Sequence, residues 1–520
     1  MTVQLLDIMD NVRKSLNGST CRHERSRIGQ FLTPVTIARF MASLFELERE
    51  NVRVLDAGAG AGVLFAALVE TLISSRHRPF SIEVIAYEND RQILPELKET
   101  MNRCENACKE VGITFQSEIR TEDFITAAIK QTEEGLFAVQ GERFTHAILN
   151  PPYKKINGLS TTRRLLDSAG IEVSNLYAAF VWLSARMLTS GGELVAITPR
   201  SFCNGPYFRR FRFALLDMIS LRRIHVFESR KKAFGDDDVL QENVIYYAVQ
   251  GAGKPERLTI SSSEGAFFEN ATIRSVPFEY VVLPDDRDAF IHLVKDNKDN
   301  QVMDRMGYFT TSLDELRLDV STGRVVDFRA REYLRPQPEE GTMPLVYPSH
   351  FQNGFVNLPL KVGKKPSAIV VSEQTEDLMV ESGYYVLTKR FSSKEERRRV
   401  VAAIYDPCRI NAPFVGFENH LNYFHAIGVG LSEILAKGLA LYLNTSLFDR
   451  YFRLFSGHTQ VNATDLKKMH YPSREQLIRL GAHVKDRMPD QETIDVILEK
   501  ECKSEDFLDR RTMMQYHGGI

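Results

Sequence analysis

The chain has 520 residues, of which 43% are hydrophobic and 26% charged, values typical of a globular protein with two to four domains. Neither a transmembrane helix nor a signal peptide is predicted, because no apolar run approaches the roughly 18 residues that span a membrane. The net charge of −2 argues against indiscriminate nucleic-acid binding, although a local basic stripe is enough for phosphate contacts.

The first half of the chain alternates short apolar runs with segments of helical periodicity. Helical spacing predicts one helix over 37–45, with Thr33 as its N-cap and Pro34 in its first turn, and another over 176–187 that ends at Gly191 and Gly192. Strands separated by helices favour an α/β fold with a doubly wound, mostly parallel, Rossmann-like sheet. The apolar runs predict strands at 52–55, 82–87, 144–149, 194–198 and 243–249.

A segment rich in glycine and proline at 250–255 follows the last of these strands and predicts a domain boundary. We therefore expect one domain over 1–255 and a second, separate domain over 256–520. The pattern of the second domain is less regular, so it is predicted to be α+β. Its clearest signals are a strand-like piece at 384–387 and helical segments at 431–455 and 474–503.

The first motif, Asp56-Ala-Gly-Ala-Gly-Ala-Gly62, lies between a predicted strand and a helix beginning near Val63. Gly58, Gly60 and Gly62 let the backbone turn tightly and approach a ligand closely. Turns of this kind bind nucleotides at the carboxyl edge of parallel sheets. A tight turn without a ligand is the alternative, and NAD fits such glycines as well as S-adenosyl-L-methionine does.

Two further positions suit an adenosine moiety. Glu88 follows the next predicted strand, where a carboxylate can accept both ribose hydroxyls. Asp123 can accept from the adenine amine, and Phe124 can cover the face of the ring. Each position also has a structural explanation, which is a solvated surface charge for Glu88 and core packing for the Asp123–Phe124 pair.

S-adenosyl-L-methionine differs from NAD because it carries an amine and a carboxylate in place of a pyrophosphate. Asp56 suits the amine. Gln30 and Thr33, in the segment Gln30-Phe-Leu-Thr33, offer donors to the carboxylate.

The strongest motif is Asn150-Pro-Pro-Tyr153, which ends the strand at 144–149. Pro151 and Pro152 cannot continue a hydrogen-bonded ladder, so they make a stiff turn at the sheet edge. An amine on a heteroaromatic ring is a poor nucleophile because its lone pair is delocalised. The Asn150 side-chain oxygen and the Pro151 carbonyl can accept both hydrogens of such an amine, while Tyr153 stacks on the base, a contact that contributes roughly 1–3 kcal/mol.

A base inside a duplex cannot reach such a turn and must be flipped out of the stack. Phe234 is the candidate for the other face of the flipped base, with Phe227 as its rival. Core packing explains an isolated phenylalanine equally well.

Taken in order, Gly29-Gln-Phe-Leu-Thr-Pro34, the glycine-rich motif and Asn150-Pro-Pro-Tyr153 resemble the gamma-class amino-methyltransferases of restriction–modification systems, of the TaqI and Eco57I kind. This resemblance covers roughly residues 20–250. It implies S-adenosyl-L-methionine as cofactor, the N6 amine of an adenine in double-stranded DNA as acceptor, and a C-terminal target-recognition domain. The implied cofactor residues are Thr33, Asp56, Gly58, Glu88, Asp123 and Phe124, and the implied base-binding residues are Asn150, Pro151, Tyr153 and Phe234.

The resemblance also implies a separately encoded restriction endonuclease as partner and a cytoplasmic location in a bacterium or an archaeon. In the second domain, the polar run at 456–462 and the basic stretch at 389–394 with Arg397, Arg398 and Arg399 are candidates for DNA contacts. Turn chemistry explains the first segment equally well, and a solvated helix face explains the second.

The nearest alternative activity is methylation of a protein glutamine amide or of RNA, because an amide nitrogen poses the same lone-pair problem. A cytosine amine also fits the chemistry of the motif. A binding protein with a decayed site is disfavoured by the intact Asn150-Pro-Pro-Tyr153. The six cysteines show no metal-ligand spacing, so we expect reduced thiols and no metal site.

Overall fold

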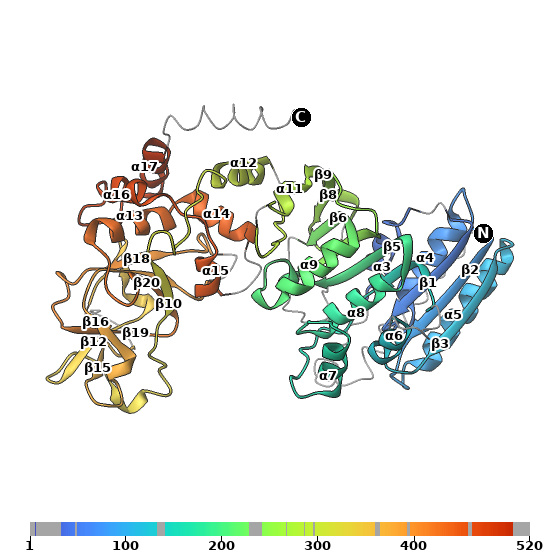
Figure 1. The fold of residues 1–520 in the computed structure, drawn as a ribbon, viewed down its shortest axis with the longest axis horizontal. Coiled ribbons are helices and arrows are strands. Elements are labelled where there is room, and N and C mark those ends of the chain that lie inside the picture. Colours follow the sequence, from blue (N-terminus) through green and yellow to red (C-terminus); the bar gives the residue numbers. More distant parts are fainter. Residues whose placement is uncertain are drawn as a thin grey trace. The chain divides into compact units, whose positions relative to one another are not determined.

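The structure, a computed structural model (Figure 1), describes residue 6 and residues 33–46, 49–132, 141–227, 242–266, 268–284, 286–294, 297–358, 365–392, 396–455 and 460–502. The chain divides into two compact units, Met1–Asp296 and Asn297–Ile520. The first unit extends beyond the expected boundary at 255. The reason is that β8 (Arg257–Ser263) and β9 (Thr272–Pro277), which follow the segment rich in glycine and proline, join the sheet of the first unit.

The first unit is built on a nine-stranded sheet with the order β3-β2-β1-β4-β5-β7-β6-β8-β9. The strands from β3 to β5 run parallel, whereas β7 is antiparallel to both of its neighbours. The predicted α/β fold with a mostly parallel sheet is therefore confirmed. The remaining strands are β1 (Asn51–Ala57), β2 (Ser81–Tyr87), β3 (Thr114–Arg120), β4 (Phe144–Leu149), β5 (Leu188–Pro199), β6 (Ile219–Phe227) and β7 (Asn243–Gln250).

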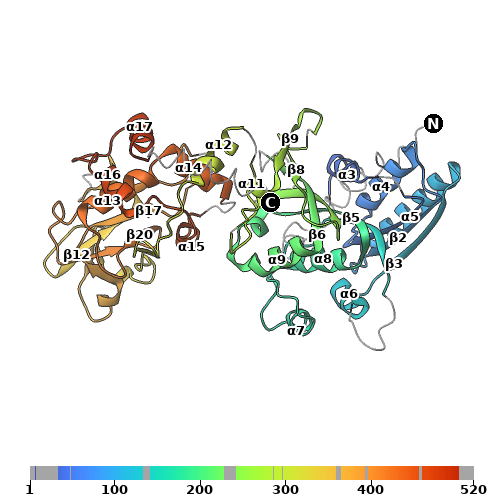
Figure 2. The same ribbon diagram turned by 45° about the horizontal axis from the view of Figure 1, so that its top comes forward.

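Helices cover both faces of this sheet (Figures 1 and 2). One face carries α3 (Val35–Ala42), α4 (Val63–Ser74) and α5 (Leu94–Glu110), and the other carries α6 (Phe124–Thr132), α8 (Leu176–Arg186) and α9 (Arg209–Met218). The sequence of α5 explains its placement, because its buried residues recur at spacings of three and four and form one apolar stripe. They include Leu97, Met101, Cys104 and Cys108. The short helices α7 (Thr161–Ser168) and α11 (Phe278–Val281) complete the unit.

Two details of the first unit differ from the prediction. Helix α8 ends at Arg186, and Gly191 and Gly192 lie inside β5 rather than after the helix. Gly191 has a φ of 69°, and the pairing of β4 with β5 shifts register just before this point. The two glycines therefore accommodate an irregularity of the strand and do not terminate the helix.

The second unit combines two sheets with a group of helices. The sheet orders are β10-β20-β17-β18-β14-β13 and β11-β15-β12-β19-β16. Its strands are β10 (Asp319–Thr322), β11 (Leu334–Arg335), β12 (Thr342–Val346), β13 (Phe351–Gln352), β14 (Phe355–Val356), β15 (Ala368–Val370), β16 (Met379–Glu381), β17 (Tyr385–Lys389), β18 (Ala402–Tyr405), β19 (Phe414–Phe417) and β20 (Leu421–His425). Its helices are α12 (Asn297–Met306), α13 (Glu433–Leu443), α14 (Ser446–Phe455), α15 (Ala463–Lys467), α16 (Arg474–Gly481) and α17 (Gln491–Cys502).

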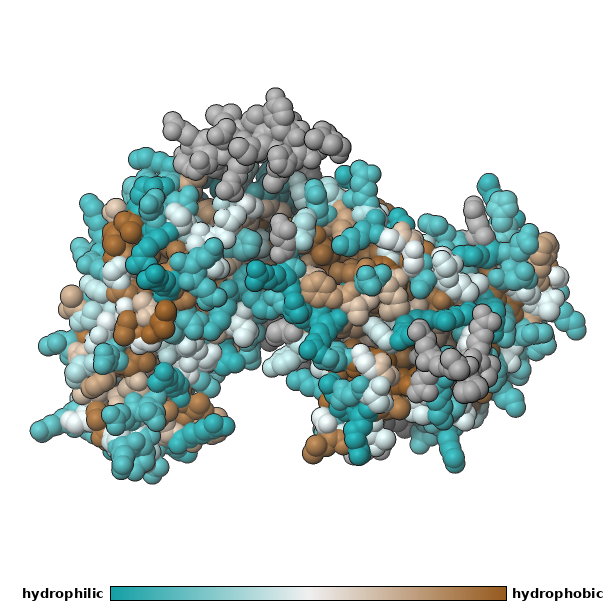
Figure 3. Space-filling view, in the orientation of Figure 1, coloured by the Kyte–Doolittle hydropathy of each residue, from teal (hydrophilic) through white to brown (hydrophobic). Residues whose placement is uncertain are grey.

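Hydrophilic side chains dominate the face of the molecule shown in Figure 3. Among the described residues, no helix combines the length and the apolar character that crossing a membrane requires.

Candidate active site

Two of the predicted motifs meet at the carboxyl edge of the nine-stranded sheet. Strand β1 lies between β2 and β4, so the chain moves to one side of β1 for β2 and β3 and returns on the other side with β4 (Figure 1). Open parallel sheets bind their ligands where the strand order reverses in this way. Asp56, near the end of β1, and Asn150, directly after β4, lie on the two sides of this position.

The turn after β1 is fixed by its backbone conformation and by hydrogen bonds to the end of β2. Gly58, Gly60 and Gly62 have φ angles of 81°, 56° and 87°, which residues with a side chain rarely adopt. The N–H of Gly58 donates to the carbonyl of Tyr87 at 2.9 Å, and the N–H of Gly60 donates to Glu88 Oε2 at 2.9 Å. The turn therefore holds its backbone in a defined position, with no side chain at the three glycines to keep a ligand away.

The Asp56 carboxylate is fully buried, and neither of its oxygens has a hydrogen-bond partner among the described residues. Burial raises the pKa of Asp56 to about 8. Because an uncompensated buried charge is costly, this position suits a ligand that brings positive charge.

Glu88 ties the glycine turn to the chain that follows β2. It is 5% exposed, and its carboxylate accepts from the N–H of Gly60 and, at 2.8 Å, from the N–H of Asp90. Burial raises the pKa of Glu88. Since a carboxylate offers about four lone-pair positions, Glu88 retains acceptor capacity for the ribose hydroxyls that the sequence analysis assigned to it.

Asp123 and Phe124 lie at the beginning of α6. Asp123 is exposed, and its Oδ1 accepts from the backbone N–H of Thr126 at 2.8 Å and from the Thr126 hydroxyl at 2.7 Å, which is a helix-capping arrangement. Phe124 is buried, with its ring centroid 5.0 Å from that of Tyr87 and 4.9 Å from that of Phe180. Capping and packing thus account for both residues, and their contact with an adenine stays a prediction.

Phe180 of α8 is a site candidate that the sequence analysis missed. A Cβ atom added to Gly58 would lie 3.7 Å from the Phe180 ring, so this ring borders the glycine turn. The sequence showed Phe180 only as one member of a helical periodicity.

Asn150 follows β4 directly, and both ends of its carboxamide are hydrogen bonded. Its Nδ2 donates to Thr33 Oγ1 at 2.9 Å, and its Oδ1 accepts from the Tyr153 hydroxyl at 3.0 Å. The Tyr153 hydroxyl also lies 3.3 Å from the carbonyl oxygen of Ile197 on β5. Burial raises the pKa of Tyr153 well above its usual value, so this hydroxyl remains a donor. Asn150 and Tyr153 are partly exposed, whereas Pro151 is buried.

The prediction that Thr33 caps the first helix was wrong. Helix α3 begins at Val35, its N-cap is Pro34, and no side chain caps it. The Thr33 side chain is 5% exposed and binds Asn150 instead. Thr33 and Asn150, which belong to two of the predicted motifs, are therefore in direct contact.

Asn243 is a second residue that the sequence analysis missed. It begins β7 opposite Pro199, the last residue of β5. The residue is 4% exposed, and neither polar atom of its carboxamide has a hydrogen-bond partner in the described part of the chain. An unsatisfied buried amide is costly, so this end of β7 suits a polar ligand. From the sequence, Asn243 was predicted only as the start of a strand.

Two predicted site residues, Gln30 and Phe234, lie outside the described residues, and so does part of the predicted polar run, at 456–459. Their assignments stay predictions.

Two arginines of the predicted basic stretch support the packing of the second unit. Arg399 is fully buried and donates to Ser392 Oγ at 2.7 Å. Arg398 donates to Gln491 Oε1 at 2.5 Å and to the carbonyl of Thr445 at 3.2 Å. Neither arginine lies on a helix face, since residues 397–399 are not helical, and both are committed to contacts within the protein.

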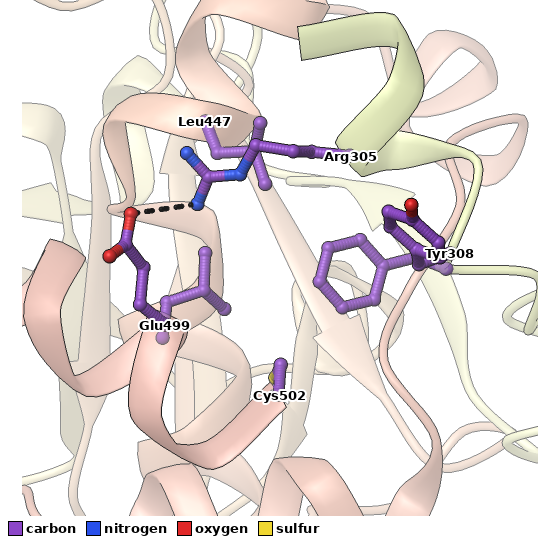
Figure 4. A pocket seen from close by; sticks show the side chains of 7 residues that line it. Arg305, Tyr308, Leu447, Glu499 and Cys502 are labelled. Carbon is purple, nitrogen blue, oxygen red and sulfur yellow. Dashed lines mark ion pairs between the residues drawn. The ribbon is translucent and has the colours of Figure 1, made fainter. Parts of the chain in front are cut away.

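A separate pocket of about 290 Å³ lies within the second unit (Figure 4). An ion pair of 3.3 Å joins Arg305 and Glu499 at this pocket, so these two charges satisfy one another. No unsatisfied carboxylate comparable to Asp56 lines it, and we therefore place the chemistry at the edge of the nine-stranded sheet. The lining residues are Arg305, Tyr308, Phe309, Leu447, Leu498, Glu499 and Cys502.

Comparison with known proteins identifies the class and then the family. Residues 39–234, within the first unit, match the family model described as Eco57I restriction-modification methylase, which points to the methylases of restriction–modification systems. The chain is 43% identical to the type II methyltransferase M.PstI of Providencia stuartii, over 96% of this chain and 97% of that relative. It is 46% identical to the type II methyltransferase M.BsuBI of Bacillus subtilis, over 92% of this chain and 94% of that relative. The chain belongs to the type II restriction–modification methyltransferases.

This membership confirms three predictions from the sequence: the fold class, methyl transfer as the activity, and S-adenosyl-L-methionine as the methyl donor. Restriction–modification methyltransferases act on DNA. Methylation of a protein glutamine amide or of RNA is therefore not favoured for this chain.

Proposed function

We propose that this chain transfers the methyl group of S-adenosyl-L-methionine to N6 of an adenine in duplex DNA. The observation that carries the proposal is the position of Asn150. Its carboxamide follows β4 at the point where the strand order reverses, next to β1, which carries Asp56 near its end and is followed by the glycine turn. This arrangement supports Asn150 as an acceptor for the amine and Asp56 as an acceptor for the cofactor, since the two follow neighbouring strands.

The residues after β1 and β2 fit the cofactor. The buried and unpaired Asp56 suits the ammonium group of the methionine end, while Thr33 suits its carboxylate and Glu88 its ribose. Asp123 and Phe124 are proposed to hold the adenine ring of the cofactor. When bound, the cofactor supplies an electrophilic methyl group on a sulfonium sulfur.

The residues after β4 fit the amine that receives the methyl group. Asn150 Oδ1 and the Pro151 carbonyl accept its two hydrogens, which withdraws the nitrogen lone pair from the ring and restores its nucleophilicity. A carboxamide oxygen has two lone pairs, so Oδ1 can keep its bond to Tyr153 meanwhile. Asn150 and Pro151 would thus hold the nitrogen lone pair toward the methyl group that a bound cofactor would supply, and the methylated amine would lose one proton to solvent.

An adenine reaches this edge only after it is flipped out of the duplex, which costs a few kcal/mol. The Tyr153 ring is proposed to stack on one face of the base and to return about 1–3 kcal/mol. Phe234 is proposed to cover the other face.

The second unit, Asn297–Ile520, is proposed to recognise the DNA sequence, because the first unit already contains the proposed cofactor and amine sites. A separately encoded restriction endonuclease that cuts the same sequence is the proposed partner.

The test offers duplex DNA, RNA and protein separately to the chain with labelled S-adenosyl-L-methionine. Labelled DNA is then digested to nucleosides and analysed by mass spectrometry. We expect label only in DNA, and there as N6-methyldeoxyadenosine. A product of N4-methyldeoxycytidine would contradict the choice of base, and label confined to RNA or protein would contradict the substrate.

A further inference from the structure

The hydroxyl of Thr33 lies against the Asn150 carboxamide, and its proton is not donated to any described residue. Thr33 Oγ1 accepts a hydrogen bond from Asn150 Nδ2 at 2.9 Å, and Thr33 is 5% exposed. No described residue accepts the proton of this hydroxyl, although a buried hydroxyl ordinarily donates as well as accepts. The missing acceptor points to a ligand on the far side of Thr33.

The orientation of the Asn150 carboxamide decides whether it can bind an amine. Its two ends are nearly equal in size but opposite in character, because Oδ1 accepts and Nδ2 donates. An amine that meets Nδ2 instead of Oδ1 faces another donor and is repelled. The Tyr153 hydroxyl does not settle the orientation, since a hydroxyl can donate to Oδ1 or accept from Nδ2.

The Thr33 hydroxyl can likewise either donate or accept a hydrogen bond, as long as its proton is not donated elsewhere. It carries one proton. Once that proton is donated to an anion, Thr33 can act toward Asn150 as an acceptor alone. Nδ2 must then face Thr33, and Oδ1 must face the target amine.

We propose that Thr33 is a positioning residue through which the bound cofactor sets the orientation of Asn150. Thr33 donates to the methionine carboxylate of the cofactor and accepts from Asn150, so a filled cofactor site selects the carboxamide orientation that binds the base. This inference rests on the proposed function, in which Asn150 holds the amine. Because coupling between two ligands is reciprocal, the cofactor tightens the binding of target DNA, and target DNA tightens the binding of the cofactor.

The experiment measures the affinity of the chain for a duplex carrying its methylation site, with and without a saturating cofactor analogue. S-adenosylhomocysteine has the methionine carboxylate, whereas 5′-methylthioadenosine lacks it. For the unchanged chain we expect S-adenosylhomocysteine to tighten DNA binding by about fivefold or more and methylthioadenosine to leave it unchanged. Equal effects of the two analogues, or no effect of either, would overturn the proposal.

Variants of Thr33 then assign the effect to its hydroxyl. Thr33→Val removes the hydroxyl at nearly constant size and should abolish the tightening, whereas Thr33→Ser should keep most of it. Under single-turnover conditions with saturating cofactor, Thr33→Val should methylate about tenfold more slowly, and Thr33→Ser should restore the rate. Tightening and rate both unchanged in Thr33→Val would refute the role of Thr33.

Two further variants guard against misinterpretation. Thr388→Val removes another buried threonine hydroxyl, on β17, which has no hydrogen-bond partner among the described residues, and it should alter neither the tightening nor the rate. Asn150→Ala should lose the tightening although Thr33 is intact, so retained tightening in this variant contradicts the proposal even if Thr33→Val folds poorly. Failure of the unchanged chain to methylate DNA would instead refute the proposed function.

Discussion

Both units contain buried aspartates, and Asp449 of the second unit differs from Asp56 of the first in how its carboxylate is satisfied. In the second unit, Asp449 Oδ1 accepts from the backbone N–H groups of Arg399 at 2.6 Å and Val400 at 2.9 Å, and Oδ2 accepts from Arg453 Nε at 2.8 Å. In the first unit, neither oxygen of Asp56 has a hydrogen-bond partner among the residues that the structure describes.

The difference separates a structural carboxylate from one that is suited to a ligand. Asp449 joins the loop before β18 to helix α14, and its hydrogen bonds compensate its burial. For Asp56, no hydrogen bond from a described residue offsets the cost of desolvating the carboxylate. It lies where the strand order of the sheet reverses. Substitution of Asp56 should therefore lower cofactor affinity, whereas substitution of Asp449 should lower the stability of the fold.

The largest effect is expected from Asp56→Asn. Replacing the carboxylate by a neutral carboxamide removes a charge-assisted contact with the cofactor ammonium, so the affinity for S-adenosyl-L-methionine should fall by about a hundredfold. Isothermal titration calorimetry measures this change. An affinity within about threefold of the unchanged chain would remove Asp56 from the cofactor site and erase the contrast with Asp449.

The contrast also marks how far the sequence alone could predict this molecule. Strand β4 (Phe144–Leu149) agrees with the prediction residue for residue because it is a short apolar run closed by two prolines. Strand β3 (Thr114–Arg120) was not predicted, because it lies at the edge of the sheet and exposes most of its side chains, so it has no apolar run.

Within the proposed site, some features could be predicted from the sequence and others could not. The glycine turn and the turn at Asn150 are local motifs, and the sequence shows each of them. The contact between Thr33 and Asn150 joins residues 117 positions apart, and the positions of Phe180 and Asn243 depend on how a helix and an antiparallel strand pack against the sheet. Local pattern carries no information on such contacts, which is why Thr33 was assigned to a helix cap.

A smaller effect, on stability and not on cofactor affinity, is expected from Asp449→Asn. The carboxamide cannot accept all three hydrogen bonds with the same strength, so the free energy of unfolding should fall by about 1–3 kcal/mol. Cofactor affinity should not change. Chemical denaturation measures the first quantity and calorimetry the second, and a loss of cofactor affinity without a loss of stability would reverse the assignment of the two aspartates.

The smallest effect is a pH dependence that Asp56 gives to the chain without cofactor. Its pKa is about 8 in the folded chain against an ordinary value of 3.8, so between these pH values the folded chain holds a proton that the unfolded chain releases. The contribution of Asp56 to stability is therefore fully present below about pH 4 and is lost as pH rises through about 8. The melting temperature of Asp56→Asn, relative to that of the unchanged chain, should rise between about pH 5 and pH 9. A difference that is flat or falls with pH would contradict the raised pKa.

The central claim is that the carboxyl edge of β1 and β4 carries methyl transfer, with Asn150 holding the amine. The most direct test measures, on one preparation of Asn150→Ala, the single-turnover rate of DNA methylation and the affinity for S-adenosyl-L-methionine. The account predicts a rate lower by about a hundredfold or more with cofactor affinity within about threefold of the unchanged chain. A rate close to that of the unchanged chain would contradict it.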